Sequence, residues 1–146
     1  MIDIKSVVED FALDNELSVI VDTAQGLNVE RDRDVNDAYK TDNDCIFLNV
    51  IMSGSMQSKL YNTALETDHS FEIGFLRRVL KQESEGSAYY DAISDLIEYA
   101  QALTYILHDR FEVIGASYSS GVDELDNNNA IVRLNISIKE TQNICS

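Results

Sequence analysis

The sequence contains no proline and no tryptophan, and it has only two cysteines and two histidines. The cysteines, Cys45 and Cys145, are too few for a metal site built on cysteine, and we expect both to be reduced thiols, as in a cytosolic protein. His69 and His108 have no neighbours in the sequence at metal-ligand spacing. We therefore expect both histidines at the surface or at its boundary, and no metal site.

Motifs for phosphate binding and for nucleophilic catalysis are also missing. None of the six glycines lies in a G-x-G-x-x-G or G-x-x-x-x-G-K pattern. The tripeptide Ser53-Gly54-Ser55 resembles a nucleophile turn superficially, but the G-x-S-x-G pattern is absent. No stretch approaches the roughly 20 apolar residues that span a bilayer, and the start of the chain lacks the basic and apolar regions of a signal peptide. We expect no enzyme activity, no cofactor and no membrane association.

Basic residues are scarce, with 11 lysines and arginines against 26 acidic residues, for a net charge of −15. Such a surface repels nucleic acid and anionic membranes, which argues against sequence-specific nucleic-acid binding. The charge fits a highly soluble protein, a partner of basic surfaces, or a wall along which DNA slides without sticking.

The acidic segment at about residues 22–44 invites a calcium interpretation. Asp32, Asp34 and Asn36 alternate as in an EF-hand loop, but Asp37 stands at the sixth position, where glycine is required, and the twelfth position lacks glutamate. No pair of clear helices flanks the segment. We therefore interpret it as a long, solvated acidic loop.

The apolar residues recur with helical spacing over Ser87–His108, which predicts one long helix. Tyr99, Ala102 and Ile106 extend its apolar surface along one flank. A second partner is expected there, either another helix of the same chain or a neighbouring subunit. A short helix is predicted from Asp3 to about Ala12.

Five segments are typical of strands, namely Leu17–Val21, Cys45–Met52, Ser70–Leu80, Phe111–Tyr118 and Ala130–Ile138. The last two are predicted to form an antiparallel hairpin with an acidic tip. Ser53–Asp68 is predicted to be irregular, with a brief helical turn, and about residues 140–146 to be a flexible tail. Arg77 and Arg78 are adjacent on a strand and point to opposite faces, so one is expected in an ion pair and the other toward a partner.

The order of these elements predicts a single α+β domain over residues 1–146. It has one mainly antiparallel sheet of four to five strands, with the long helix and the short N-terminal helix packed on one face.

Three runs carry a resemblance to a known family: SFEIGFLRRV, YYDAISDLIEYAQALTYIL and FEVIGASYSSGVDELDNNNAIVRLNISI. In the order and length of their predicted elements and in their hydrophobic pattern, these runs resemble the second half of tailed-phage tail-terminator and tail-completion proteins. In that family a strand precedes one long helix and a two-stranded hairpin. The resemblance covers Asp44–Ile138. It implies a small structural subunit that assembles into a ring at the head-proximal end of the tail or in the neck, without enzyme activity or cofactor. The acidic segment at about residues 22–44 departs from a minimal family member.

A ring of this kind implies particular surfaces. A closed ring needs a heterologous interface, which exposed strand edges and the apolar helix flank (Tyr99, Ala102, Ile106) are candidates to supply. The expected partners are copies of the chain and other phage neck or tail proteins, in a virion made in the host cytoplasm. A lumen that DNA crosses is expected to be acidic. The candidate lumen or inter-ring residues are Asp32, Asp34 and Asp37 of the acidic loop and Asp123, Glu124 and Asp126 of the hairpin tip.

Two other classes of function stay open. The first is an acidic inhibitor that mimics DNA and occupies a basic cleft, for which Asp91, Asp95 and Glu98 form one acidic stripe on the long helix. The second is a ligand-binding or enzymatic α+β domain with a pocket between sheet and helix, which the lack of a convergent polar set argues against.

Overall fold

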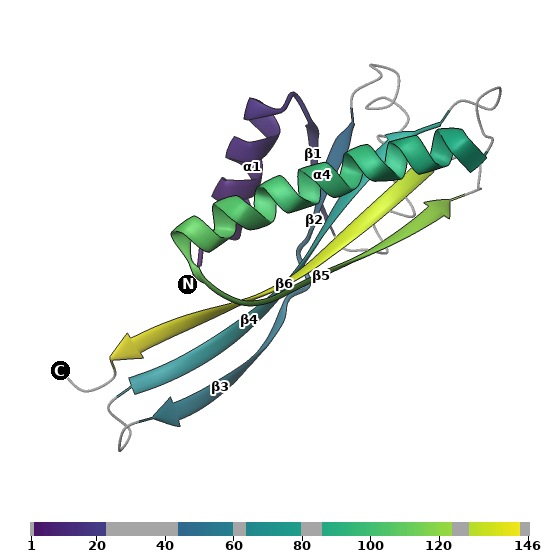
Figure 1. Cartoon of the computed structure of the whole chain (residues 1–146). Coiled ribbons are helices and arrows are strands. Elements are labelled where there is room, and N and C mark those ends of the chain that lie inside the picture. The colour runs from purple at the N-terminus through teal and green to yellow at the C-terminus, as the bar shows by residue number, and fades with distance from the viewer. Residues whose placement is uncertain (1, 23–43, 60–63, 80–85, 124–128, 144–146) are drawn as a thin grey trace.

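A computed structural model describes residues 2–22, 44–59, 64–79, 86–123 and 129–143 of the chain. Over these residues the fold is α+β, as predicted: two helices cover one face of a six-stranded, mostly antiparallel sheet (Figure 1). The elements are α1 (Ile4–Asp14), β1 (Ser18–Asp22), β2 (Cys45–Asn49), β3 (Ser53–Lys59), β4 (Ala64–Arg78), α4 (Gly86–Arg110), β5 (Glu112–Asp123) and β6 (Asn129–Asn143). None of the described helices is long and apolar enough to cross a bilayer.

Both predicted helices form, for the local reasons that the sequence suggests. The carboxylate of Asp3 accepts a hydrogen bond of 3.0 Å from the Ser6 backbone N–H, which caps the first turn of α1. In α4 the buried residues recur every three or four positions, and His108 and Arg110 lie in the last turn, where positive charge complements the helix dipole. The fully buried side chains along α4 include Leu96, Leu103 and Leu107.

The strands of the sheet lie in the order β1-β2-β4-β6-β5, and β3 pairs with the first half of β4. Only the β1–β2 pair is parallel among the pairs described; the others are antiparallel, including the predicted β5–β6 hairpin. In the half of the sheet that the helices cover, β1 and β5 are therefore the two edge strands.

Strand β4 divides the core between the two faces of the sheet. Phe71, Ile73 and Phe75 face the helices and join the main core with residues of α1 and α4. Leu76 faces the other way and belongs to a smaller buried cluster with Cys45, Phe47 and Ile131. The main core lies between the sheet and the two helices, and it holds α4 across the strands (Figure 1).

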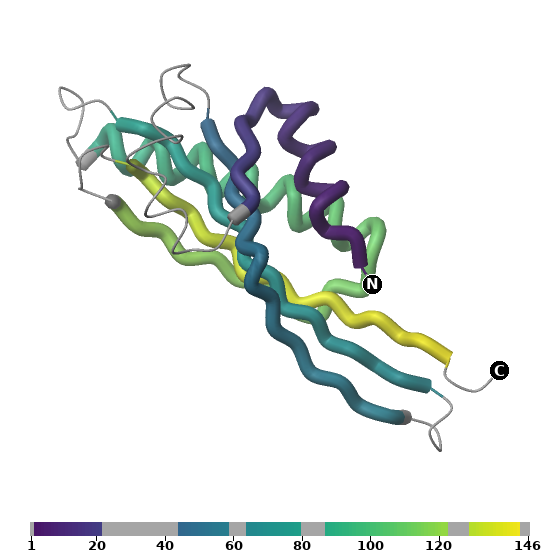
Figure 2. The backbone as a smooth tube through the Cα atoms, turned by 180° about the vertical axis from the view of Figure 1, so that it is seen from behind, coloured from purple at the N-terminus to yellow at the C-terminus, as the bar shows by residue number. Residues whose placement is uncertain are grey.

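A three-stranded arm extends beyond both helices (Figures 1 and 2). It consists of β3, the first half of β4 (Ala64–Ser70) and the end of β6 (Ser137–Asn143). The prediction that Ser53–Asp68 is irregular is wrong: β3 and β4 form an antiparallel pair there. With β3 the sheet has six strands, one more than the four to five predicted. The end of β6 likewise runs to Asn143, where a tail from about residue 140 was predicted.

Gly54 is required where β3 and β4 pair. A Cβ atom at this position would lie 2.5 Å from the backbone carbonyl oxygen of Asp68, which cannot move without breaking the strand pair. We expect Gly54→Ala to destabilise the arm by about 1–3 kcal/mol because of this overlap. Amide hydrogen exchange in β3 should become about 5- to 150-fold faster.

The matched control is Gly121→Ala in β5, where an added Cβ meets nothing within 4 Å. It should leave exchange in β3 unchanged. Equal exchange rates in Gly54→Ala and the wild-type protein would contradict the close approach of the two strands.

Candidate interaction surface

The described residues contain no group of three or more histidine, cysteine, aspartate or glutamate side chains able to hold a metal ion. His69 lies in the arm, where its Nε2 atom is 3.1 Å from Oε1 of Glu140 on β6. This hydrogen bond lowers the pKa of Glu140 below its ordinary value. His108 is exposed at the end of α4. Both histidines are therefore at the surface or its boundary, as predicted.

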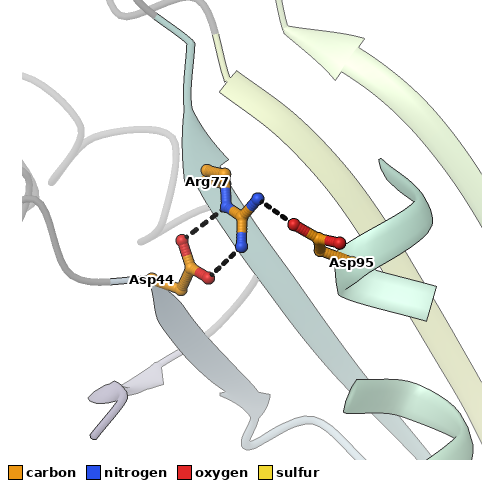
Figure 3. Close-up of polar contacts among 3 residues, drawn as sticks. All are labelled: Asp44, Arg77 and Asp95. Atoms are coloured by element: carbon orange, nitrogen blue, oxygen red, sulfur yellow. Dashed lines mark hydrogen bonds and ion pairs between the residues drawn. The ribbon is translucent and has the colours of Figure 1, made fainter. Parts of the chain in front are cut away.

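Among the described residues, a polar cluster joins β4, α4 and the residue before β2 (Figure 3). Arg77 donates to both carboxylate oxygens of Asp44, over 2.9 and 2.8 Å, and to Asp95 over 2.6 Å. The bidentate geometry makes the Asp44 bond the stronger of the two. Arg78 points to the opposite face and is exposed. Arg77 thus forms the expected ion pair, which mainly joins β4 to the residue before β2 and adds an exposed contact to α4.

The contacts of Tyr99 show what covers this part of the apolar flank of α4. Its ring stacks on Phe75 at 6.2 Å between centroids and meets Phe11 of α1 edge-on at 6.3 Å. Burial, with a further contribution from the nearby Asp44 carboxylate, raises the pKa of the Tyr99 hydroxyl. At this position the partner is a helix of the same chain. Ile106 is half-buried against the core and Ala102 is exposed, and their role in a subunit interface stays a prediction.

Most of the predicted lumen residues lie outside the described part of the chain, namely Asp32, Asp34, Asp37, Glu124 and Asp126. Asp123 is the last residue of β5, which runs five residues past the predicted end of the strand at Tyr118 and into the predicted turn cluster. The lumen assignment of all six residues stays a prediction.

Cys45 is buried in the smaller cluster on the far face of the sheet. Burial, helped by the neighbouring Asp44 carboxylate, raises the pKa of its thiol to about 12. Since the thiolate is the reactive form, we expect no modification of folded Cys145→Ser protein by a maleimide at pH 8. Complete modification is expected after unfolding in urea, measured by intact mass. Rapid modification of the folded protein would contradict the burial of Cys45.

The edge strand β5 is an exposed surface that sequence reasoning did not single out. From Val113 to Val122 it contains no charged residue, although charged residues make up 25% of the chain. Ile114, Tyr118 and Val122 are exposed on it. Tyr118 also lines an apolar groove, of about 340 Å³, between β5 and α4. A long, uncharged, unpaired edge is a template for another chain.

The opposite edge of the sheet has the same character. Val19 and Val21 of β1 are each about 40% exposed, and Ser18 through Val21 carry no charge. Val21 lines a second apolar groove, of about 280 Å³, with residues that precede α1 and follow β2, among them Ile2 and Val50. The part of the sheet that the helices cover therefore presents two different edges on opposite sides, each with an uncharged run of residues. The hydrophobic pattern predicts the strands, but only the pairing order shows that these two are the edges.

Comparison of the chain with protein-family models and with curated proteins finds no match.

Proposed function

We propose that this protein is a structural subunit of a tailed-phage particle. It assembles into a ring at the head–tail junction, as a tail terminator or neck connector, and DNA passes through the ring. One observation carries the proposal: where the helices cover it, the described sheet ends in two different edges, β1 and β5, whose residues Ser18–Val21 and Val113–Val122 are uncharged. A head-to-tail ring needs two distinct patches on each subunit, and these edges are suited to supply them.

Two further features support the same function. The chain order of β4, α4, β5 and β6 matches the strand, long helix and hairpin of the tail-terminator and tail-completion proteins that the sequence resembles. The net charge of −15 is suited to a ring around DNA, because phosphates do not adhere to an acidic wall. The partners of the ring would be its own copies and the adjoining neck or tail proteins.

A DNA-mimicking inhibitor is less well supported. A mimic presents unpaired acidic side chains, whereas Asp95 of the acidic stripe on α4 is bound to Arg77. On the arm, Glu66 lies 3.8 Å from Lys139, and beyond the arm, on the same two strands, Glu72 lies 3.8 Å from Arg133. These pairings reduce the acidic surface available to a basic cleft.

Immunogold labelling tests the location. Antibodies against the purified protein should place gold at the head–tail junction of particles of the phage that encodes it, and preimmune serum should not. Purified particles that carry no label and no band of the protein would overturn the proposal.

A further inference from the structure

We propose that the β5 edge of one copy pairs with the β1 edge of the next copy, which joins the two sheets into one. The inference rests on the proposed function, because it takes a second copy of the chain as the occupant of the edge. It goes further by naming which strands meet and in which direction.

The register of the sheet places the two edges level with each other. Tyr118 pairs with Leu134, Leu134 with Ile73, Ile73 with Leu48, and Leu48 with Val21. One row of residues thus runs straight across the sheet from β5 to β1, on the face that the helices cover. The next row on the same face of the sheet runs in the same way from Ser120 on β5 to Val19 on β1.

The strand directions are also suited to pairing. β1 is parallel to β2, and each of the next three steps, to β4, β6 and β5, is antiparallel, so β1 and β5 run in opposite directions. A rotation about an axis along the strands preserves these directions. The β5 edge of one copy then meets the β1 edge of the next as an antiparallel pair, without any shift along the strands.

Apolar surface lies at both ends of the row. Tyr118 and Leu134 line the groove beside α4, and Val21 and Leu48 line the groove beside α1. When two copies meet edge to edge, Val21 of one comes beside Tyr118 of the other. The contact therefore buries exposed apolar side chains from both copies, in addition to pairing the two backbones.

Charge limits where two copies are able to meet. Each carries a net charge of −15, so most approaches bring like charges together. Val113–Val122 on β5 and Ser18–Val21 on β1 carry no charge. The two edges are thus surfaces on which copies approach without this repulsion, which favours a second copy over a basic partner as the occupant.

Gly121 of β5 points to the same surface. A Cβ at Gly121 would meet nothing within 4 Å among the described residues, and the residue has no positive φ, so the described fold of the single chain does not require a glycine there. Glycine weakens a strand, and within one it often marks a place where another backbone approaches closely. The register places Gly121 level with Ser18 of β1, so a neighbouring copy accounts for it, whereas Gly115 lies at a register shift of β5 and beyond the end of β1.

Cysteine cross-linking tests the contact. Val19→Cys and Ser120→Cys change exposed residues at the two ends of one row, in a Cys145→Ser background in which Cys45 is buried. Each variant alone should give no cross-linked product with a short bis-maleimide. A mixture of the two should give covalent dimers and nothing larger, and the double variant should give a ladder of oligomers.

The outcomes separate the contact from the function. Dimers from Ser120→Cys alone would replace the proposed pairing with a two-fold β5–β5 contact, and no product from the mixture would overturn it. A ladder from chains that never close into rings would uphold the edge contact and overturn the ring. Closed rings without cross-links between these positions would uphold the ring and overturn the edge contact.

Gly121→Val provides a second test, since valine favours strands and the space beside Gly121 is open. The monomer should unfold at the same or a higher temperature. The protein concentration needed for assembly should rise at least about tenfold. Unchanged assembly would overturn the close approach at Gly121.

Discussion

Replacing Phe75 by alanine is expected to lower the free energy of unfolding by about 3–5 kcal/mol. The Phe75 side chain is fully buried, and its ring contacts those of Phe11 on α1 and Tyr99 on α4. The cavity would therefore open where the sheet and both helices meet. Domains of this kind are stable by only about 5–15 kcal/mol, so the loss is a large share of the total. Urea unfolding of the monomer, followed by circular dichroism, measures it.

Two control variants separate the cavity from a general effect of losing an aromatic ring. Tyr90→Ala removes a strongly exposed ring from α4 and should change the stability by no more than about 0.5 kcal/mol. Phe75→Leu keeps most of the volume and should cost less than Phe75→Ala. Similar losses in Phe75→Ala and Tyr90→Ala would contradict the placement of Phe75 at the centre of the core.

Arg77→Ala is expected to lower the free energy of unfolding by about 1–3 kcal/mol. The loss comes mainly from Asp44, whose side chain is only 12% exposed and would lose two charged hydrogen bonds. The pair with Asp95 contributes less, since the Asp95 side chain is 54% exposed and surface ion pairs are weak. Asp95→Ala should therefore cost less than Arg77→Ala in the same unfolding experiment.

The neighbouring Arg78 offers a matched control for this site. Arg78 is exposed on the other face of the sheet, and Arg78→Ala should leave stability nearly unchanged. The stability of Arg77→Lys should lie between those of Arg77→Ala and the wild type. Lysine keeps the positive charge but lacks the planar guanidinium that binds Asp44 through two bonds. Equal stability of Arg77→Ala and Arg78→Ala would show that the bonds from Arg77 to Asp44 and Asp95 do not stabilise the fold.

The elements that the sequence predicts well are those with a strong local pattern. The long helix is predicted as Ser87–His108 and observed as Gly86–Arg110, because its apolar residues recur with helical spacing throughout. The β5–β6 hairpin is marked by alternation in Ala130–Ile138 and by the turn-forming cluster that precedes it. In each case the signal lies within a segment of about twenty residues, where periodicity is informative.

The arm could not be predicted in this way, because its strands are held by partners far along the chain. Every described side chain of β3 is exposed, so the strand has no apolar alternation to reveal it. It forms because β4 pairs with β6 on one side and leaves its other edge open to β3. A strand that is exposed on both faces has no alternation of apolar and polar residues from which it could be predicted.

Local sequence pattern is also insufficient to predict the candidate interface. The sequence marks the flank of α4 at Tyr99 as unusually apolar, but only the packing shows that Phe11 of the same chain occupies it. That Val21 and Tyr118 end one row depends on four strand pairings joined in a particular register. Only the β5–β6 hairpin among these pairings is marked locally in the sequence; the other three are not.

Sedimentation velocity over a hundredfold range of protein concentration, with negative-stain images of the most concentrated sample, tests the central claim most directly. We expect one discrete large species that grows at the expense of the monomer and appears as closed rings. A monomer at every concentration, or open filaments of no fixed length, would contradict it.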